Sequence, residues 1–234
     1  MRSLWILSVA FAATMFFGTL VLLIAAVRST SGLIDWLIRR WARTLVNAAG
    51  IELHSENLEI LDPKRRYILV SNHYSYFDIP CILAAVEQPI RFMAKASLFQ
   101  IPVFGWAIGR AGFIPIDRKN RRTAVKSFDL AADRIRKGNT IVIFPEEGRS
   151  RTREMRPFQR GAFLLAIKSQ QTMVPIAVDG TFNVFPVGAR SVTPGKVTVR
   201  AGVPIETAGC TLRDKERLAE ATRTQIAAML GLAP

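Results

Sequence analysis

An uncharged apolar segment lies near the start of the chain, from Leu4 to Val27. As a helix with a rise of about 1.5 Å per residue it would be roughly 36 Å long, which is enough to cross a bilayer. The apolar region of a signal peptide is shorter. The arginines that follow outnumber Arg2, the only one before the segment, and they are Arg28, Arg39, Arg40 and Arg43. This asymmetry predicts that the rest of the chain lies on the cytoplasmic side.

A second helix is predicted from about Ser31 to Ala49. Its apolar side chains recur at helical spacing and form one stripe, made of Ile34, Leu37, Ile38, Trp41, Leu45 and Ala48. The arginines fall on the opposite side. Because the stripe directly follows a membrane segment, we predict a helix that lies at the lipid surface. One full span followed by a surface helix, or a hairpin that dips into one leaflet, would both fit. Residues 1–49 are predicted to anchor the protein.

From residue 50 onward, apolar runs of strand length alternate with amphipathic helical patterns. Strands are predicted at residues 67–71, 91–94, 113–117, 140–144, 173–178 and 196–201. Helices are predicted at residues 77–86, 103–109, 123–137, 158–170 and 211–230. This alternation predicts an α/β fold in which helices flank a mostly parallel sheet. Residues 50–234 are predicted to form one catalytic domain.

The amino-acid composition, and the net charge above all, limits the kinds of molecule that the protein is expected to bind. The net charge is +14, with 32 Lys and Arg against 18 Asp and Glu. This charge favours anionic partners, such as acidic lipid head groups, phosphorylated substrates, an acidic carrier protein or nucleic acid. The basic residues match no nucleic-acid motif and show no aromatic stacking platform, so nucleic acid is not expected. With two cysteines and two histidines, we expect neither a zinc site nor a disulfide framework.

Polar residues that could take part in catalysis or substrate binding follow three of the predicted strands. His73 and Asp78 come after the first, Asp117 and Arg118 after the third, and the segment Phe144 to Ser150 after the fourth. In α/β folds, catalytic groups lie beyond the carboxyl ends of strands. A carboxylate on one ring nitrogen of His73 would leave the other nitrogen as a base. The alternative is that Asp78 only caps a helix with Ser75 as its N-cap.

Four ordered blocks of residues resemble the 1-acyl-sn-glycerol-3-phosphate acyltransferase family, whose blocks read N-H-x4-D, G-x4-D-R, F-P-E-G-T-R-S and V-P-[IV]-A-[IV]. In this chain they are matched by Asn72-His73 with Asp78, Gly112 to Arg118, Phe144 to Ser150, and Val174 to Val178. A family stretch A-K…L-F-x-I-P-x-x-G-W is matched by Ala94-Lys95 and Leu98 to Trp106. The third block departs from the family, because Glu147-Gly148 stands where Gly-Thr is commonest. This departure leaves the acceptor open.

The resemblance implies that a fatty acyl group moves from a thioester to the 2-hydroxyl of 1-acyl-sn-glycerol-3-phosphate, giving phosphatidic acid. His73 would be the general base and Asp78 would orient it. Arg149 would bind the acceptor phosphate, and Glu146 would contact its polar part. The remaining residues implied at the substrate site are Gly148, for close backbone approach, and Arg118 and Lys95, for phosphate. The chain has no G-x-S-x-G, so a serine acyl-enzyme has no support.

The expected co-substrate is a thioester of coenzyme A or of acyl carrier protein, with no metal and no further cofactor. Membrane lipid and a lysophospholipid acceptor are the other expected partners, at the cytoplasmic face of a membrane that we expect to be a bacterial inner membrane. Other acceptors stay open, among them lyso-ornithine lipid, another lysophospholipid and glycerol-3-phosphate. A hydrolase with the same residue pair, or a basic membrane-bound binding protein without activity, are the competing functions.

Overall fold

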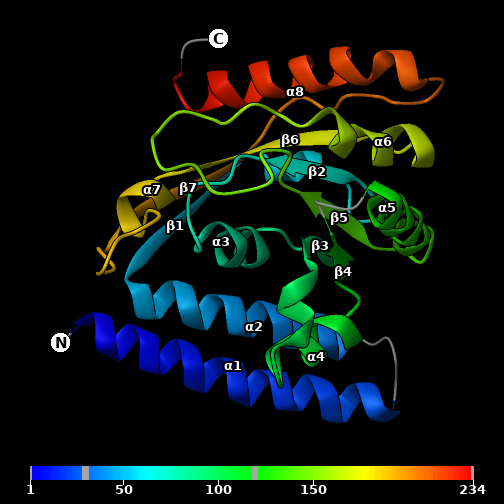
Figure 1. Ribbon diagram of the computed structural model, residues 1–234. Helices are drawn as coiled ribbons and strands as arrows, with labels where there is room; N and C mark the ends of the chain where they lie inside the picture. Colours follow the sequence, from blue (N-terminus) through cyan, green and yellow to red (C-terminus); the bar gives the residue numbers. More distant parts are fainter. Residues whose placement is uncertain (1, 28–31, 118–120, 233–234) are drawn as a thin grey trace.

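A mixed sheet organises the molecule (Figure 1). The computed structural model describes residues 2–27, 32–117 and 121–232. Within them, the sheet has seven strands in the order β1-β7-β6-β2-β5-β3-β4. Every neighbouring pair is parallel except β6 with β7. The strands are β1 (Ile51–Glu56), β2 (Ile68–Ser71), β3 (Ile90–Lys95), β4 (Ile114–Ile116), β5 (Thr140–Ile143), β6 (Met173–Asp179) and β7 (Gly195–Ala201).

Helices cover both faces of this sheet. On one face lie α1 (Arg2–Val27), α2 (Gly32–Ala49), α3 (Asp78–Ala85) and α4 (Phe104–Arg110), and on the other α5 (Arg121–Arg136), α6 (Leu164–Ser169) and α8 (Lys215–Met229). The short helix α7 (Thr181–Val184) follows β6. Single 3-10 turns are η1 (Leu58–Ile60), η2 (Ala96–Gln100), η3 (Arg160–Phe163) and η4 (Leu212–Asp214). The predicted α/β class with a mostly parallel sheet is confirmed.

Strand β1 and helix α6 differ from the sequence prediction, and the short helix α7 had no counterpart in it. Strand β1 was not predicted, because its sequence Ile-Glu-Leu-His-Ser-Glu is mostly polar and partly exposed. It forms at the sheet edge, where it pairs in parallel with β7 and needs only a few apolar contacts. The helix predicted over residues 158–170 is shorter, since a 3-10 turn at Arg160–Phe163 leads into α6.

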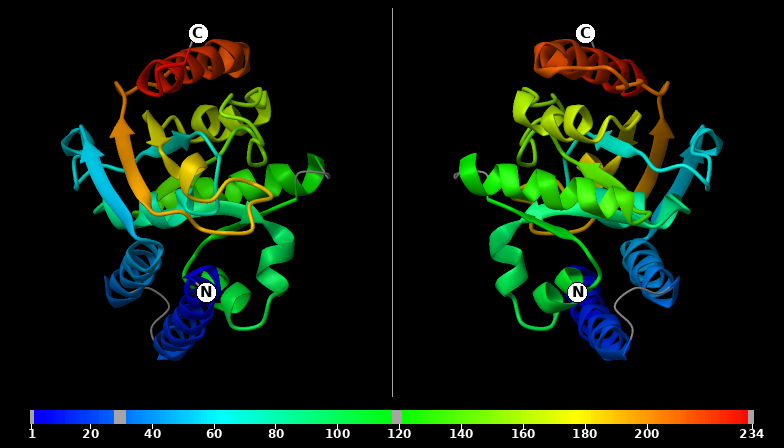
Figure 2. Two further views of the ribbon diagram at one scale, coloured as in Figure 1. Left: turned by 90° about the vertical axis from the view of Figure 1, so that its left-hand side faces the viewer. Right: turned by 90° about the vertical axis from the view of Figure 1, so that its right-hand side faces the viewer.

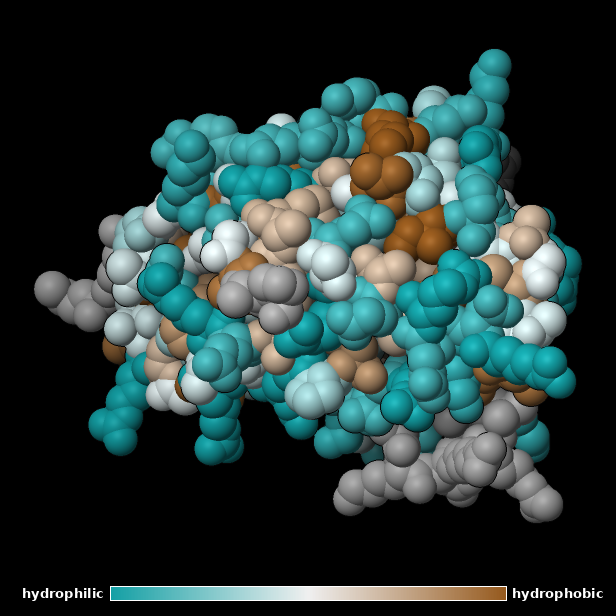
Figure 3. Space-filling model, turned by 90° about the horizontal axis from the view of Figure 1, so that it is seen from above, coloured by the Kyte–Doolittle hydropathy of each residue, from teal (hydrophilic) through white to brown (hydrophobic). Residues whose placement is uncertain are grey.

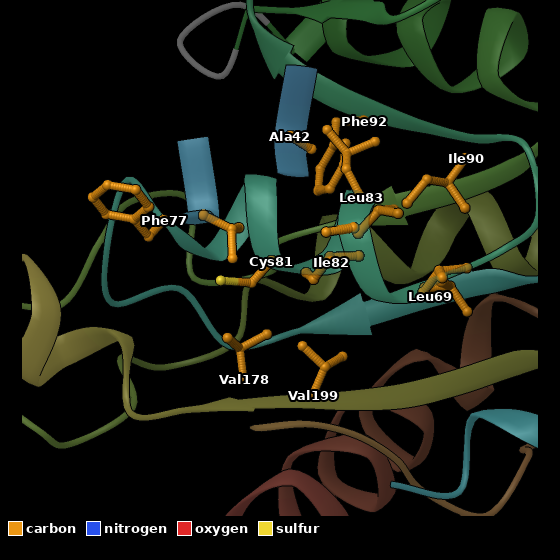
Figure 4. Packing of buried hydrophobic residues seen from close by; sticks show 14 of the residues in the cluster. Ala42, Leu69, Phe77, Cys81, Ile82, Leu83, Ile90, Phe92, Val178 and Val199 are labelled. Atoms are coloured by element: carbon orange, nitrogen blue, oxygen red, sulfur yellow. The ribbon is translucent and has the colours of Figure 1, made fainter. Parts of the chain in front are cut away.

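The two N-terminal helices share a hydrophobic core with the sheet. Apolar residues of α2, among them Leu37 and Ala42, are buried in the same cluster as Phe92 of β3. Figure 4 shows Ala42 near Phe92 and Leu83, above the side chains with which α3 covers the sheet. An ion pair between Asp35 and Arg91, 2.6 Å from Oδ1 to Nη2, also joins α2 to β3.

Helix α1 lies against α2 and α4 and forms the outer layer of this side. Its residues Ser3–Val27 are long and apolar enough to cross a membrane. The side chains on its free face are large and apolar, and they include Leu4, Trp5, Leu7, Phe11, Phe16 and Leu23. Figure 2 shows α1 and α4 at one end of the molecule and α8 at the other. The face that carries α8 is mostly hydrophilic (Figure 3).

Candidate active site

The site begins where β2 ends, at the side chain of Asn72. This buried amide donates a hydrogen bond to the carbonyl of Val178 (2.9 Å) and accepts one from its N–H (2.8 Å). The two bonds join the end of β2 to β6, after the regular ladder between these strands has finished. Asn72 therefore holds the backbone of His73 at the carboxyl edge of the sheet, where the sequence predicts the site.

The structure brings His73 and Asp78 together as predicted. Nδ1 of His73 lies 2.7 Å from Oδ2 of Asp78, whose side chain is fully buried. The same oxygen accepts backbone hydrogen bonds from Tyr74 (2.7 Å) and Ser75 (2.8 Å), and Oδ1 accepts one from the hydroxyl of Thr181 (2.5 Å). A carboxylate held by donors accepts the Nδ1 proton, so Nε2 of the ring keeps its lone pair. This nitrogen can act as a base.

Asp78 does not have the helix-capping role that the alternative gave it. Helix α3 starts at Asp78 itself, its N-cap residue is Phe77, and no side chain caps it. The prediction of Ser75 as N-cap is therefore wrong. The Ser75 hydroxyl instead donates to the carbonyl of Phe185 (2.7 Å) and accepts from the N–H of Phe77 (3.2 Å). The carboxylate turns back toward the loop before the helix, which is why it reaches the imidazole.

A stack of aromatic rings runs from the base into an apolar cavity. The imidazole of His73 lies on Phe144, with centroids 4.1 Å apart and planes 14° apart. Phe144 stacks on Phe92 (5.6 Å), and Phe92 on Phe113 (6.1 Å). Phe92 and Phe113 also line the cavity, together with residues of α1, α2, α3 and α4 that include Phe17, Trp41, Leu83 and Ala107. Phe144 and Phe92 therefore connect the base to the apolar cavity.

Glu146 joins two loops of the site. Its Oε1 accepts the backbone N–H of His73 and its Oε2 that of Arg156, both at 2.8 Å. Burial raises the pKa of this carboxyl to about 7, and the negative charge of Asp78 also raises it, whereas the two backbone hydrogen bonds oppose the rise. The side chain is 1% exposed, so Glu146 acts as a buried brace between the loop after β2 and the loop after β5.

Arginine side chains lie beside this brace. The guanidinium carbon of Arg149 lies 3.3 Å from the centroid of the Tyr76 ring. Its Nη1 is buried and has no hydrogen-bond partner among the residues that the structure describes. At Gly148, an added Cβ would lie 2.6 Å from Nη1 of Arg156, so this guanidinium rests on the glycine backbone. A positive charge therefore lies against Gly148, and a second belongs to the next residue in the sequence, Arg149.

The other predicted substrate residues are less defined. Lys95 is exposed at the carboxyl end of β3, the edge of the parallel strands at which His73 lies. Arg118 falls outside the described residues. No group of three or more His, Cys, Asp or Glu in the described part of the chain is arranged to hold a metal ion.

Several functional contacts had no signal in the sequence. Thr181 lies 103 positions from the carboxylate that it holds, and nothing in its local pattern marks it. Phe144 belongs to a recognised block, but its place under the imidazole depends on β5 lying next to β2. Arg156 stands outside all four blocks, and only its position against Gly148 draws attention to it.

Known proteins share both the sequence pattern and the fold. A chloroplast 1-acyl-sn-glycerol-3-phosphate acyltransferase of Brassica napus is 36% identical over 151 residues, which cover 64% of this chain and 43% of that protein. The human 1-acyl-sn-glycerol-3-phosphate acyltransferase alpha is 31% identical over 175 residues, which cover 74% of this chain and 62% of that protein. The chain thus spans about two-fifths of the length of the plant relative.

A solved structure has the same fold. It is the 1-acyl-sn-glycerophosphate acyltransferase PlsC of Thermotoga maritima, with a TM-score of 0.78, 24% identity, and coverage of 95% of this chain and 94% of that one. The profile of the acyltransferase family matches residues 52–179, which include His73, Asp78, Glu146 and Arg149. Because this match covers more than half of the sequence, the chain belongs to the acyltransferase family.

Proposed function

We propose that this chain transfers a fatty acyl group from a thioester to the 2-hydroxyl of 1-acyl-sn-glycerol-3-phosphate, which gives phosphatidic acid. The observation that carries the proposal is His73, whose Nδ1 lies 2.7 Å from a buried carboxylate and whose Nε2 is left with its lone pair. The Phe144 ring stacks on this imidazole and on Phe92, which lines the apolar cavity. The named relatives, 1-acyl-sn-glycerol-3-phosphate acyltransferases, support the choice of acceptor.

The reaction follows from this geometry. Nε2 of His73 takes the proton of the acceptor hydroxyl as its oxygen attacks the thioester carbonyl carbon. The carbon–sulfur bond then breaks, and the leaving thiolate takes the proton back from the imidazolium. Asp78 stabilises the imidazolium while it exists and keeps the ring in the reactive tautomer. These steps need no cofactor besides the thioester.

The apolar cavity supplies a place for an acyl chain. Its lining consists almost entirely of apolar side chains, among them Phe17, Leu83 and Phe104. Burial of a methylene group contributes about 0.8 kcal/mol, so a long chain gains considerable binding free energy there. Such a cavity would serve a hydrolase equally, and acyl transfer is favoured over hydrolysis by the acyltransferase family match and the named relatives.

The acyl donor is a thioester of coenzyme A or of acyl carrier protein. Both are anionic, and the net charge of +14 suits either of them. The purified full-length protein should be incubated with each donor and a panel of acceptors: 1-acyl-glycerol-3-phosphate, glycerol-3-phosphate, lysophosphatidylcholine, lyso-ornithine lipid, and no acceptor. Mass spectrometry should find phosphatidic acid as the main product. Free fatty acid as the main product, or a preference for another acceptor, would contradict the proposal.

The base is tested by His73→Ala. A general base contributes roughly 10²–10⁴-fold to the rate, so kcat should fall by that factor while the variant still folds. His54→Ala is the matched control, because the partly exposed ring of His54 lies on the edge strand β1, pairs with Glu52 and should be dispensable. Equal turnover by both variants would refute the assignment.

The placement in the membrane is a further part of the proposal. At about 1.5 Å per residue, α1 is roughly 39 Å long, and it packs on α2 and α4 while its free face is apolar. This arrangement favours a helix that lies in the cytoplasmic leaflet of the membrane, with the active site at the level of the lipid head groups. A tag on the N-terminus should then react from the same side as one on the C-terminus. Labelling from opposite sides would instead indicate a full span.

A further inference from the structure

Two arginines, Arg149 and Arg156, lie in the loop after β5. Among the described residues, neither Arg149 nor Arg156 forms an ion pair with a carboxylate. The nearest carboxylate of the site, Glu146, already accepts a backbone N–H at each of its oxygens. A guanidinium presents five N–H donors, and an unmatched pair of them favours the binding of an anion.

Gly148 determines how the two arginines are arranged. An added Cβ at this position would lie 2.6 Å from Nη1 of Arg156, which is closer than real Cβ contacts allow. The missing side chain therefore lets the Arg156 guanidinium lie against the backbone of Gly148, the residue that precedes Arg149 in the sequence. The Arg149 guanidinium in turn is held against the ring of Tyr76, with its buried Nη1 unpaired. Both arginines belong to the loop between β5 and η3, at residues 144–159.

The same loop is tied to the catalytic base. Glu146 accepts the N–H of His73 at one oxygen and the N–H of Arg156 at the other, both at 2.8 Å. The carbonyl of His73 also accepts the N–H of Ser150 at 2.9 Å. An anion held at the loop therefore keeps a constant position relative to the imidazole.

We propose that Arg156 is a second phosphate-binding residue, which holds the phosphate of the acceptor together with Arg149 across Gly148. This assignment rests on the proposed function. It makes Arg156 a residue that determines specificity for phosphate-bearing lyso-lipids. The phosphate carries close to two negative charges at neutral pH, and two guanidinium groups match it better than one.

A phosphate monoester also occurs in the donor, at the ribose of coenzyme A, so the test separates the two sources. Initial rates should be measured for wild type and Arg156→Gln with 1-acyl-glycerol-3-phosphate and with the same lipid lacking phosphate, 1-acyl-glycerol. Each acceptor should be tested with acyl-coenzyme A and with its dephospho form. The matched control is Arg151→Gln, which replaces an exposed arginine of the same loop.

We expect Arg156→Gln to raise the KM for 1-acyl-glycerol-3-phosphate roughly tenfold to a hundredfold with little change in kcat, because the contact is the same in the ground state and the transition state. The KM for 1-acyl-glycerol and for either donor should stay near that of wild type. Arg156→Lys should recover part of the loss. Arg151→Gln should behave as wild type with all four substrates.

A second variant tests the geometry. Gly148→Ala should displace the Arg156 guanidinium at small cost to the fold, since the contact involves the flexible end of a side chain. Its KM for the phosphate acceptor should therefore rise as in Arg156→Gln, and the double variant should be no worse than either single one. Additive losses, or an unchanged acceptor KM in Arg156→Gln, would overturn the assignment. A loss confined to acyl-coenzyme A would assign Arg156 to the donor. A wild-type protein inactive on the lipid with every donor would refute the proposed function itself.

Discussion

Replacement of Glu146 by glutamine should change how stability depends on pH. Burial raises the pKa of this carboxyl from its ordinary 4.5 to about 7 in the folded protein. Between these two values the folded state holds a proton that the unfolded state has released. The carboxyl therefore contributes most to stability below pH 4.5, and this contribution is lost as the pH rises through 7. At 1.36 kcal/mol for each pKa unit, the difference amounts to about 3 kcal/mol.

The glutamine variant stays neutral at every pH and serves as the reference. Urea unfolding of both proteins in detergent micelles from pH 4.5 to 8.5 gives the difference in their free energies of unfolding, from which other titrating groups cancel. Wild type should lose about 3 kcal/mol relative to Glu146→Gln across this range. Glu147→Gln, which removes an exposed carboxyl of the same turn, should not show this trend. Parallel curves for wild type and Glu146→Gln would refute a buried carboxyl with a raised pKa.

Three further substitutions test the supports of the site. Thr181→Val removes a donor to the catalytic carboxylate, so it should lower the free energy of unfolding in urea by about 1.5–3 kcal/mol and also lower kcat. Thr181→Ser keeps the hydroxyl and should keep both the stability and kcat. Equal losses in the two variants would contradict the role of this hydroxyl. Phe144→Leu removes the ring under His73, worth about 0.5–1.5 kcal/mol, and should lower kcat several-fold rather than raise the acceptor KM. Gly105→Ala would put a Cβ 2.6 Å from the carbonyl oxygen of Phe99, so its melting temperature should drop by several degrees; an unchanged value would contradict this packing.

Most of the fold could be predicted because its strands are buried. β2, β5 and β6 are apolar runs of the length that a sheet covered on both faces requires. β1 could not be predicted in this way, since it lies at the edge and its pairing with β7 depends on contacts between residues far apart in sequence. A hydropathy pattern reports how much of a segment is buried, and it carries little information on a polar edge strand.

The candidate site was predictable where its residues are close in sequence. His73 and Asp78 are five positions apart, and the end of one strand with the start of one helix suffices to join them. The partners of this pair come from elsewhere. Glu146 follows β5 and Thr181 follows β6, the two strands on either side of β2. The sequence shows that residues follow strands, but it does not give the strand order that brings these residues to the base.

The contribution of α1 and α2 to the proposed reaction extends beyond attachment. Phe17 of α1 and Trp41 of α2 line the apolar cavity, and Phe92 on its other side leads through Phe144 to the imidazole of His73. The loop after β5, which carries the two arginines, begins at Phe144 of the same ring stack. An acceptor with one acyl chain and one phosphate matches this combination of an apolar cavity and a basic loop, since its chain would fit the cavity while its phosphate would reach the loop. In the proposed arrangement, with α1 in the leaflet, this helix would form part of the wall that binds the acyl chain, and a lipid acceptor would reach the base without leaving the membrane.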